Sequence, residues 1–288
     1  MDLVTNIDRF PTPGETMFGS DFHQFAGGKG ANQAVAASRL GAEVTFVGCV
    51  GDDDYGKQII DKLSTENINI DNIVTLKDTP TGIANILVTK SDNIITVVPG
   101  ANYEFKKELV ESKKDVILNS DLVLLQLEIP LKTVESVIDI AHRGNVPIIL
   151  NPAPAVALKK DVLKKVDFIT PNETELKLLT LDNDEKLEVL FEKLFKLGSN
   201  HVIMTYGKKG AVYGNQNKGL EYFKSYDVEV VDTTGAGDTF NGALAVSIAR
   251  GKAINEAIDF ANRAAALSTT KVGAQTGMPT NKEVLDYI

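Results

Sequence analysis

The chain has 288 residues, of which 43% are hydrophobic and 24% are charged, and its formal net charge is −9. This composition is ordinary for a globular protein, and the length allows one large core or two modest domains. The negative charge argues against a nucleic-acid-binding surface, which usually needs a basic face. There is no signal peptide and no apolar run long enough to span a membrane. We therefore expect a cytoplasmic protein that binds neither nucleic acid nor membrane.

Four side chains that often carry chemistry have structural roles on this interpretation. Cys49 is the only cysteine, which excludes an internal disulfide, and its apolar surroundings (V-G-C-V-G) are typical of a buried, inert thiol. His23, His142 and His201 lie in unrelated segments without the spacing of metal ligands.

Two stretches of the N-terminal third are rich in β-forming residues and are predicted to share a small sheet. Residues 2–7 read as a strand, residues 10–16 as a turn-rich connection, and strand-like sequence continues to Phe25. The runs 81–89 and 93–98, joined by residues 90–92, predict a hairpin. Together these segments predict a sheet separate from the main core.

Between these stretches, a glycine-rich loop leads into a helix of small residues that ends near Gly41. Three glycines surround Lys29 in the segment G-G-K-G-A-N-Q-A, and they would let the backbone approach a ligand closely. The spacing is not that of a Walker A loop. A tight turn with close helix packing explains the glycines equally well, whereas Lys29 and Asn32 beside them favour ligand contacts.

From residue 106 onward, short apolar strands alternate regularly with amphipathic helices. Strands are predicted at 121–127, 146–150, 166–170, 202–206 and 211–213, in addition to an earlier strand at 44–50 that precedes a helix over 52–67. This alternation predicts an α/β fold with a mostly parallel central sheet and helices on both faces. Such sheets bind ligands where strands end at their carboxyl edge.

Three strand ends carry candidate residues. Glu128 follows the strand 121–127 and could also be an ordinary exposed carboxylate. Asn172 and Glu175 are typical of a helix N-cap with an acid in its first turn, yet they could equally face a phosphate–Mg²⁺ group. Thr205 is followed by Gly207 and Gly210, which suit close contact with a nucleotide.

The most informative stretch is Val231–Leu244, V-D-T-T-G-A-G-D-T-F-N-G-A-L. It follows an alternating run at 226–231 that predicts a strand, and it leads into a helix over 239–250. Thr-Gly-Ala-Gly has almost no side-chain bulk, so backbone N–H groups can converge there on an anion. Asp238 could simply cap the helix. The flanking glycines favour a second interpretation, a general base beside an anion hole, which is the arrangement that phosphoryl transfer requires.

The stretch D-T-T-G-A-G-D-T-F resembles the second signature of the ribokinase-type (PfkB) carbohydrate kinases, and G-G-K-G-A-N-Q-A-V-A-A resembles the first. The resemblance extends to P-T-P-G-E at 11–15 and N-P-A-P at 151–154. It implies a ribokinase-like fold whose core is formed by residues 26–79 and 101–288. Residues 2–25 and 80–100 would form a β-sheet lid over the sugar, through which two copies would associate as a homodimer.

The same resemblance assigns roles to individual residues. Asp238 would be the catalytic base, and the N–H groups of Gly235, Ala236 and Gly237 would form the anion hole. Asp2, Gly28, Lys29, Asn32 and Glu128 would hold the sugar. ATP and Mg²⁺ would be served by Asn172, Glu175, Thr205, Gly207, Gly210, Gly237 and Asn262. Backbone groups around a monovalent cation, K⁺ by this resemblance, would come from Asp232, Thr234, Ser268, Lys271, Gly273 and Gly277.

The resemblance implies ATP-dependent phosphorylation of D-ribose at its 5-hydroxyl group. The alternatives are another acceptor (fructose, deoxyribose or a nucleoside) and a weakly active sugar- or nucleotide-binding form. The last alternative arises because the family normally begins with a strand ending G-S-x-N-x-D, and this chain starts within that motif at Asp2. We therefore expect the core to lack its first strand.

Overall fold

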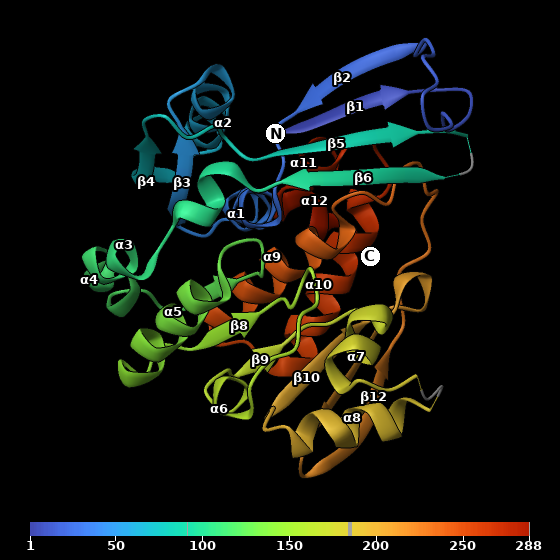
Figure 1. Ribbon diagram of the computed structural model, residues 1–288. Coiled ribbons are helices and arrows are strands. Elements are labelled where there is room, and N and C mark those ends of the chain that lie inside the picture. The colour runs from blue at the N-terminus through green and yellow to red at the C-terminus, as the bar shows by residue number, and fades with distance from the viewer. Residues whose placement is uncertain (91, 184–185, 288) are drawn as a thin grey trace.

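The computed structural model describes residues 1–90, 92–183 and 186–287 of the chain (Figure 1). A four-stranded sheet lies along one side of the molecule, and its strands follow the order β2-β1-β5-β6. The strands are β1 (Asp2–Asn6), β2 (Asp21–Phe25), β5 (Ile83–Val88) and β6 (Asn93–Val98). β1 runs antiparallel to β2 and parallel to β5, and β5 runs antiparallel to β6. All four strands fall within the segments 2–25 and 80–100; residue 91, in the expected hairpin connection, lies outside the described residues.

The core contains a six-stranded sheet and a separate parallel pair. The larger sheet has the order β12-β11-β10-β9-β8-β7 and is parallel from β7 to β10, whereas β11 and β12 are antiparallel. Its strands are β7 (Val123–Leu125), β8 (Ile148–Leu150), β9 (Phe168–Ile169), β10 (His201–Thr205), β11 (Ala211–Asn215) and β12 (Lys218–Phe223). β3 (Thr45–Gly51) pairs only with β4 (Asn69–Leu76) in the described sheets. The mostly parallel α/β core is confirmed.

Helices cover both faces of the six-stranded sheet. Alternate residues of one strand show this division, because Ile148 and Leu150 pack toward α5, whereas Ile149 packs toward α9 and α10. The described helices are α1 (Lys29–Arg39), α2 (Asp54–Thr65), α3 (Lys107–Ser112), α4 (Lys114–Leu118), α5 (Leu131–Arg143), α6 (Lys160–Leu163), α7 (Glu173–Thr180), α8 (Leu187–Lys196), α9 (Ala236–Ala249), α10 (Ile254–Ser268), α11 (Ala274–Gly277) and α12 (Asn281–Asp286), with 3₁₀ turns η1 (Gly100–Glu104) and η2 (Gly207–Lys209).

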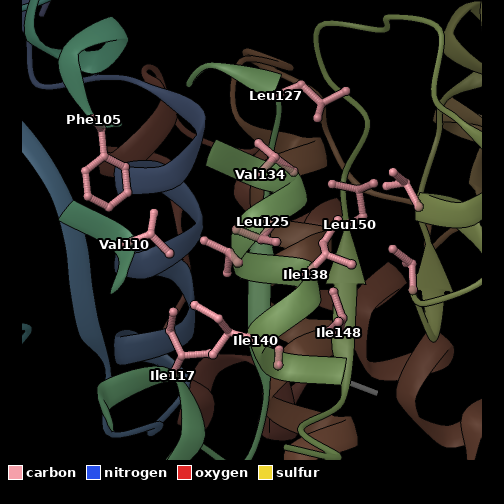
Figure 2. Close-up of a cluster of buried hydrophobic side chains, with 14 of the residues drawn as sticks. Phe105, Val110, Ile117, Leu125, Leu127, Val134, Ile138, Ile140, Ile148 and Leu150 are labelled. Carbon is pink, nitrogen blue, oxygen red and sulfur yellow. The ribbon is translucent and has the colours of Figure 1, made fainter. Parts of the chain in front are cut away.

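The segment from η1 to α4 is fixed to the core by apolar contacts. Phe105, Val110 and Ile117 lie on one side of α5, and Leu125 and Ile148 of the sheet belong to the same buried cluster (Figure 2). These side chains hold α5 against β7 and β8. The strand ends that follow β7 and β8 therefore rest on a rigid base.

The structure differs from the sequence-based expectation in three elements. Residues 226–231 alternate in polarity but do not form a strand, and β4 and β12 were not predicted. Among the described residues, no strand joins β3 to β7, and the first strand of the chain lies in the small sheet. No described helix is both long and apolar enough to cross a membrane.

Candidate active site

The N-terminus of α9 places a carboxylate beside backbone amides. Gly235 precedes the helix with φ 78°, and a side chain there would meet the Ala274 Cα at 2.9 Å, so only glycine fits. Asp238, in the first turn, is 8% exposed. The Ala236 N–H donates to the Thr233 carbonyl (3.2 Å), whereas the described residues offer no partner to the N–H groups of Gly235 or Gly237. A turn already occupies the hydrogen of Ala236, so two of the three expected amides are available to a ligand.

Both oxygens of the Asp238 carboxylate accept hydrogen bonds from α1. The Asn32 Nδ2 donates to Oδ2 and the Gln33 Nε2 donates to Oδ1, each at 3.0 Å. The Asn32 Oδ1 in turn accepts from the Gln275 Nε2 at 3.0 Å. Sequence reasoning placed Asn32 on the sugar and gave Gln33 no role. The only sequence feature that could have indicated a role for Gln33 was its position next to Asn32 in the glycine-rich segment.

The glycine-rich loop brings two more carboxylates to the same place. The Lys29 N–H donates to the Glu128 Oε2 at 2.8 Å. Gly28 has φ 93°, and Gly27 leaves no room for a side chain because an added Cβ would lie 2.1 Å from an Asp2 oxygen. The structure thus unites Asp2, Lys29 and Glu128, which are distant in sequence, beside the first turn of α9.

These carboxylates lie in a buried, acidic environment, and the nearby cations are Lys29 and the N-terminal ammonium group of Met1. Burial raises the pKa of Asp238, and Lys29 with the amides of Gln33 and Asn32 lowers it only in part. Burial likewise raises the pKa of Asp2 and of Glu128, and the neighbouring charge of Asp238 adds to both increases. A group of hydrogen-bond-accepting carboxylates suits a ligand with several hydroxyl groups.

The start of α7 confirms a structural role for two candidates. Asn172 and Glu175 form a capping box: the Asn172 Oδ1 accepts from the Glu175 N–H, and the Glu175 Oε2 accepts from the Asn172 N–H, each at 2.8 Å. Burial raises the pKa of Glu175, with Lys29 lowering it and Asp238 raising it. Glu175 therefore caps the helix and also lies within electrostatic reach of the site.

The residues that were expected to bind the nucleotide differ from one another in their surroundings. Thr205 lies beside Asn172 in a parallel bridge, and Gly207 has φ 54° with open space where a side chain would be. An added Cβ on Gly210 would instead lie 2.0 Å from the Phe223 carbonyl oxygen, so this glycine serves packing of the chain against itself. Asn262 is buried and donates to the carbonyls of Phe223 and Lys224, each at 3.4 Å.

The loop after α10 contains the backbone groups that were expected around a monovalent cation. A side chain on Gly277 would lie 2.3 Å from the Ser268 carbonyl oxygen and 3.4 Å from that of Lys271, so both oxygens converge on one small space. Asp232 secures the loop, because its carboxylate accepts from the N–H groups of Thr234 (2.9 Å) and Gly273 (2.8 Å). Burial opposes ionisation of Asp232, but a hydrogen bond from the Thr234 hydroxyl group, together with these two N–H groups, outweighs it and lowers its pKa. These residues fit a monovalent cation held by backbone oxygens.

The Cys49 thiol lacks the properties of a reactive group. Burial, with a smaller effect from Glu104, raises the pKa of its thiol to about 11, which keeps it protonated and unreactive. Among the described residues, no group of three or more His, Cys, Asp and Glu side chains could hold a metal ion.

Comparison with known proteins agrees with this geometry. The model of the pfkB family of carbohydrate kinases matches residues 1–281. A ribokinase of Bacillus subtilis is 46% identical over 290 residues, which cover 100% of this chain and 96% of that protein.

Two solved structures are similar over almost the whole chain. The ribokinase of Thermotoga maritima is 39% identical, with a TM-score of 0.91, and the match covers 99% of this chain and 94% of that one. The Arabidopsis thaliana ribokinase in complex with ribose and ATP is 34% identical, with a TM-score of 0.93 and the same coverage.

Proposed function

This chain belongs to the pfkB family of carbohydrate kinases, and from that membership we propose that it transfers the γ-phosphoryl group of ATP to the 5-hydroxyl of D-ribose. The observation that carries the proposal is the buried Asp238 carboxylate in the first turn of α9, beside amides of Gly235 and Gly237. Similarity to ribokinases over the full chain supports ribose as the acceptor. We expect the enzyme to act in the cytoplasm, where ATP is available.

Asp238 would accept the proton of the attacking hydroxyl group as the hydroxyl oxygen bonds to the γ-phosphorus and the bond from that phosphorus to the bridging oxygen breaks, so that ADP leaves. The Gly235 and Gly237 N–H groups and the positive end of the α9 dipole would stabilise negative charge on the transferred group. Lys29 would contribute further positive charge. Asp2, Glu128 and the second amide hydrogen of Asn32 would orient the sugar through its hydroxyl groups.

The remaining candidates would hold the second substrate and the ions. Thr205 and Gly207 would contact the nucleotide, with Asn262 near the base, whereas Gly210 would only shape the loop. Glu175, positioned by its capping box with Asn172, would face the phosphates and Mg²⁺, which neutralises phosphate charge when bound. The carbonyls of Ser268 and Lys271, with the loop positioned by Asp232, Thr234 and Gly273, would hold K⁺ against Gly277.

We further propose a homodimer formed through the small sheet. Phe25, Asp2, Ala84 and Val97 occupy one row across its four strands, so their side chains share a face. Val97 is 64% exposed on that face. His23, Ile86 and Ile95 form the next row, and the His23 and Phe25 rings stack with centroids 5.9 Å apart. A second copy of this chain would cover these apolar groups and exclude water from the sugar.

The assay is ADP release by the purified protein with ATP and a panel of D-ribose, 2-deoxyribose, fructose and a nucleoside. We expect kcat/KM to be highest for ribose. We expect Asp238→Asn to lower kcat for ribose by at least about 10²-fold, because the base is lost. Undiminished turnover by this variant would reject Asp238 as the base, and a tenfold preference for another acceptor would reject ribose as the substrate.

A further inference from the structure

The Asp238 carboxylate accepts a hydrogen bond from Gln33, a residue of another helix for which the sequence predicted no substrate contact. Gln33 lies on α1, is fully buried, and donates from its Nε2 to the Asp238 Oδ1 at 3.0 Å. With Asn32 on the other oxygen, neither oxygen can rotate without breaking a hydrogen bond. Each oxygen keeps a lone pair with which to accept a hydroxyl proton.

The direction of the Gln33 amide is dictated by a backbone carbonyl two hydrogen bonds away. The Thr170 carbonyl can only accept, so Asn151 presents its Nδ2 there (3.0 Å) and turns its Oδ1 toward Gln33. The Gln33 Nε2 then donates one hydrogen to that Oδ1 (3.0 Å) and the other to Asp238. On its opposite end, the Gln33 Oε1 accepts from the Gln126 Nε2 at 2.5 Å. The reverse orientation of Gln33 would set oxygen against oxygen at Asn151 and Asp238 and nitrogen against nitrogen at Gln126.

The amides that orient Gln33 come from neighbouring strands of the parallel sheet. Gln126 follows β7, Asn151 follows β8 and Thr170 follows β9, and these strands are adjacent in the order β9-β8-β7. Strand ends packed into a rigid core hold side chains more closely than loops do. The chain of hydrogen bonds from Thr170 through Asn151 and Gln33 therefore fixes the orientation of the Asp238 carboxylate relative to the sheet.

We propose that Gln33 is a positioning residue for phosphoryl transfer, which holds Asp238 ionised and correctly turned through the relay Thr170–Asn151–Gln33–Asp238. This inference rests on the proposed kinase function. The relay opposes an unfavourable environment, because Asp238 is buried and faces Asp2 from β1, Glu128 after β7 and Glu175 from α7. Lys29, on α1, is the cation that acts on Asp238. Donation to a carboxylate favours its charged form.

The test compares wild type with Gln33→Met, which keeps the length of the side chain and removes its N–H groups. We expect kcat for ribose to fall about 10- to 100-fold, as for loss of a hydrogen bond to a charged group. The KM for ATP should change less than about twofold, since Gln33 does not face the nucleotide residues. The acid limb of the kcat–pH profile should move to higher pH, because the base becomes harder to ionise.

Two further variants separate positioning from stability. Thr133→Val removes an equally buried hydrogen bond, from the Thr133 Oγ1 to the Phe105 carbonyl, which involves no residue of the relay, and should leave the profile unmoved. Gln126→Met removes only the hydrogen bond to the Gln33 Oε1, so it should lower kcat less than Gln33→Met does. This variant replaces Gln33→Met in the test if Gln33→Met does not fold. An unmoved acid limb in both Gln33→Met and Gln126→Met would overturn the relay.

A second measurement does not depend on turnover. Carbon-13 NMR of aspartate-labelled protein, with Asp238→Asn for assignment, gives the pKa of Asp238 in wild type and in Gln33→Met. We expect a higher pKa in the variant, and equal values would overturn the relay. Wild-type protein that phosphorylates no sugar would reject the proposed function, while the NMR titration would still decide whether Gln33 controls Asp238.

Discussion

At the scale of single residues, Glu128 should limit stability at neutral pH. Its folded-state pKa is raised, chiefly by burial, so the stability it contributes is present below its unfolded pKa and is lost as the pH rises through the folded value. Glu128→Gln keeps an oxygen for the Lys29 N–H and removes the charge. We expect its Tm to exceed that of wild type by about 2–4 °C at pH 8, for roughly 1 kcal/mol, and to match it near pH 4.

The same substitution should weaken sugar binding, because a hydroxyl group bonds more strongly to a carboxylate than to an amide. We expect the KM for ribose to rise about tenfold or more. Glu229→Gln, at an exposed carboxylate, is the control for loss of one negative charge. Equal Tm differences between Glu128→Gln and wild type at both pH values would show that the buried charge is not the cause.

Sequence predicted the site residues whose function depends on their immediate neighbours. Gly28, Gly235 and Asp238 stand in short motifs where backbone freedom or helix position can be read directly. Gln33 could not be assigned in this way, because its partners Gln126, Asn151 and Asp238 are 93, 118 and 205 positions away. Their convergence depends on how two strand ends and the start of α9 meet α1, and no local pattern encodes that.

At the scale of elements, the site depends on the close crossing of α1 and α9. Gly242 on α9 permits this approach, because an added Cβ would lie 2.7 Å from the Ala36 Cβ and 2.9 Å from the Gln33 carbonyl oxygen. We expect Gly242→Ala to lower the free energy of unfolding in urea by about 1–3 kcal/mol. Since Gln33 and Asn32 would move away from Asp238, kcat should fall while the KM for ATP changes little.

The matched control for that variant is Gly219→Ala in β12, where an added Cβ meets nothing within 4 Å and φ is not positive. Its stability and kcat should stay near those of wild type. If Gly242→Ala lost stability but kept full kcat, the helix crossing would not be what positions the base.

The periodicity of apolar residues in the sequence predicted the helices and strands that pack against other elements. The same periodicity gave wrong predictions for segments that do not pack. Residues 226–231 alternate in polarity, yet no neighbouring strand pairs with them and they remain irregular. β12 was missed because most of its residues are exposed, which removes the apolar pattern of a buried strand. The bounds of helix α9 were predicted within three residues because its small and apolar residues recur along much of its length.

At the scale of the whole molecule, the small sheet carries the proposed dimer interface. β6 is exposed along its whole length, and Ile94, Ile95, Val97 and Val98 are large apolar side chains among its residues. Isolated exposed apolar residues are common, but Ile95 and Val97 share one face of the sheet with Phe25 and Ile86, and such a grouped apolar face is typical of an interface. The row that includes Asp2 also borders the proposed sugar site, so association and activity should be linked.

Val97→Lys tests this association, because a charge in the shared face would have to be buried without a partner. We expect multi-angle light scattering to give twice the chain mass of 31.1 kDa for wild type and a single chain mass for the variant. The KM for ribose should rise in parallel, since the sugar would lose its cover. Ile94→Lys, on the same strand but three positions away and hence on the opposite face, should remain dimeric. A monomeric wild type, or a dimer that only Ile94→Lys disrupts, would contradict the assignment of this face.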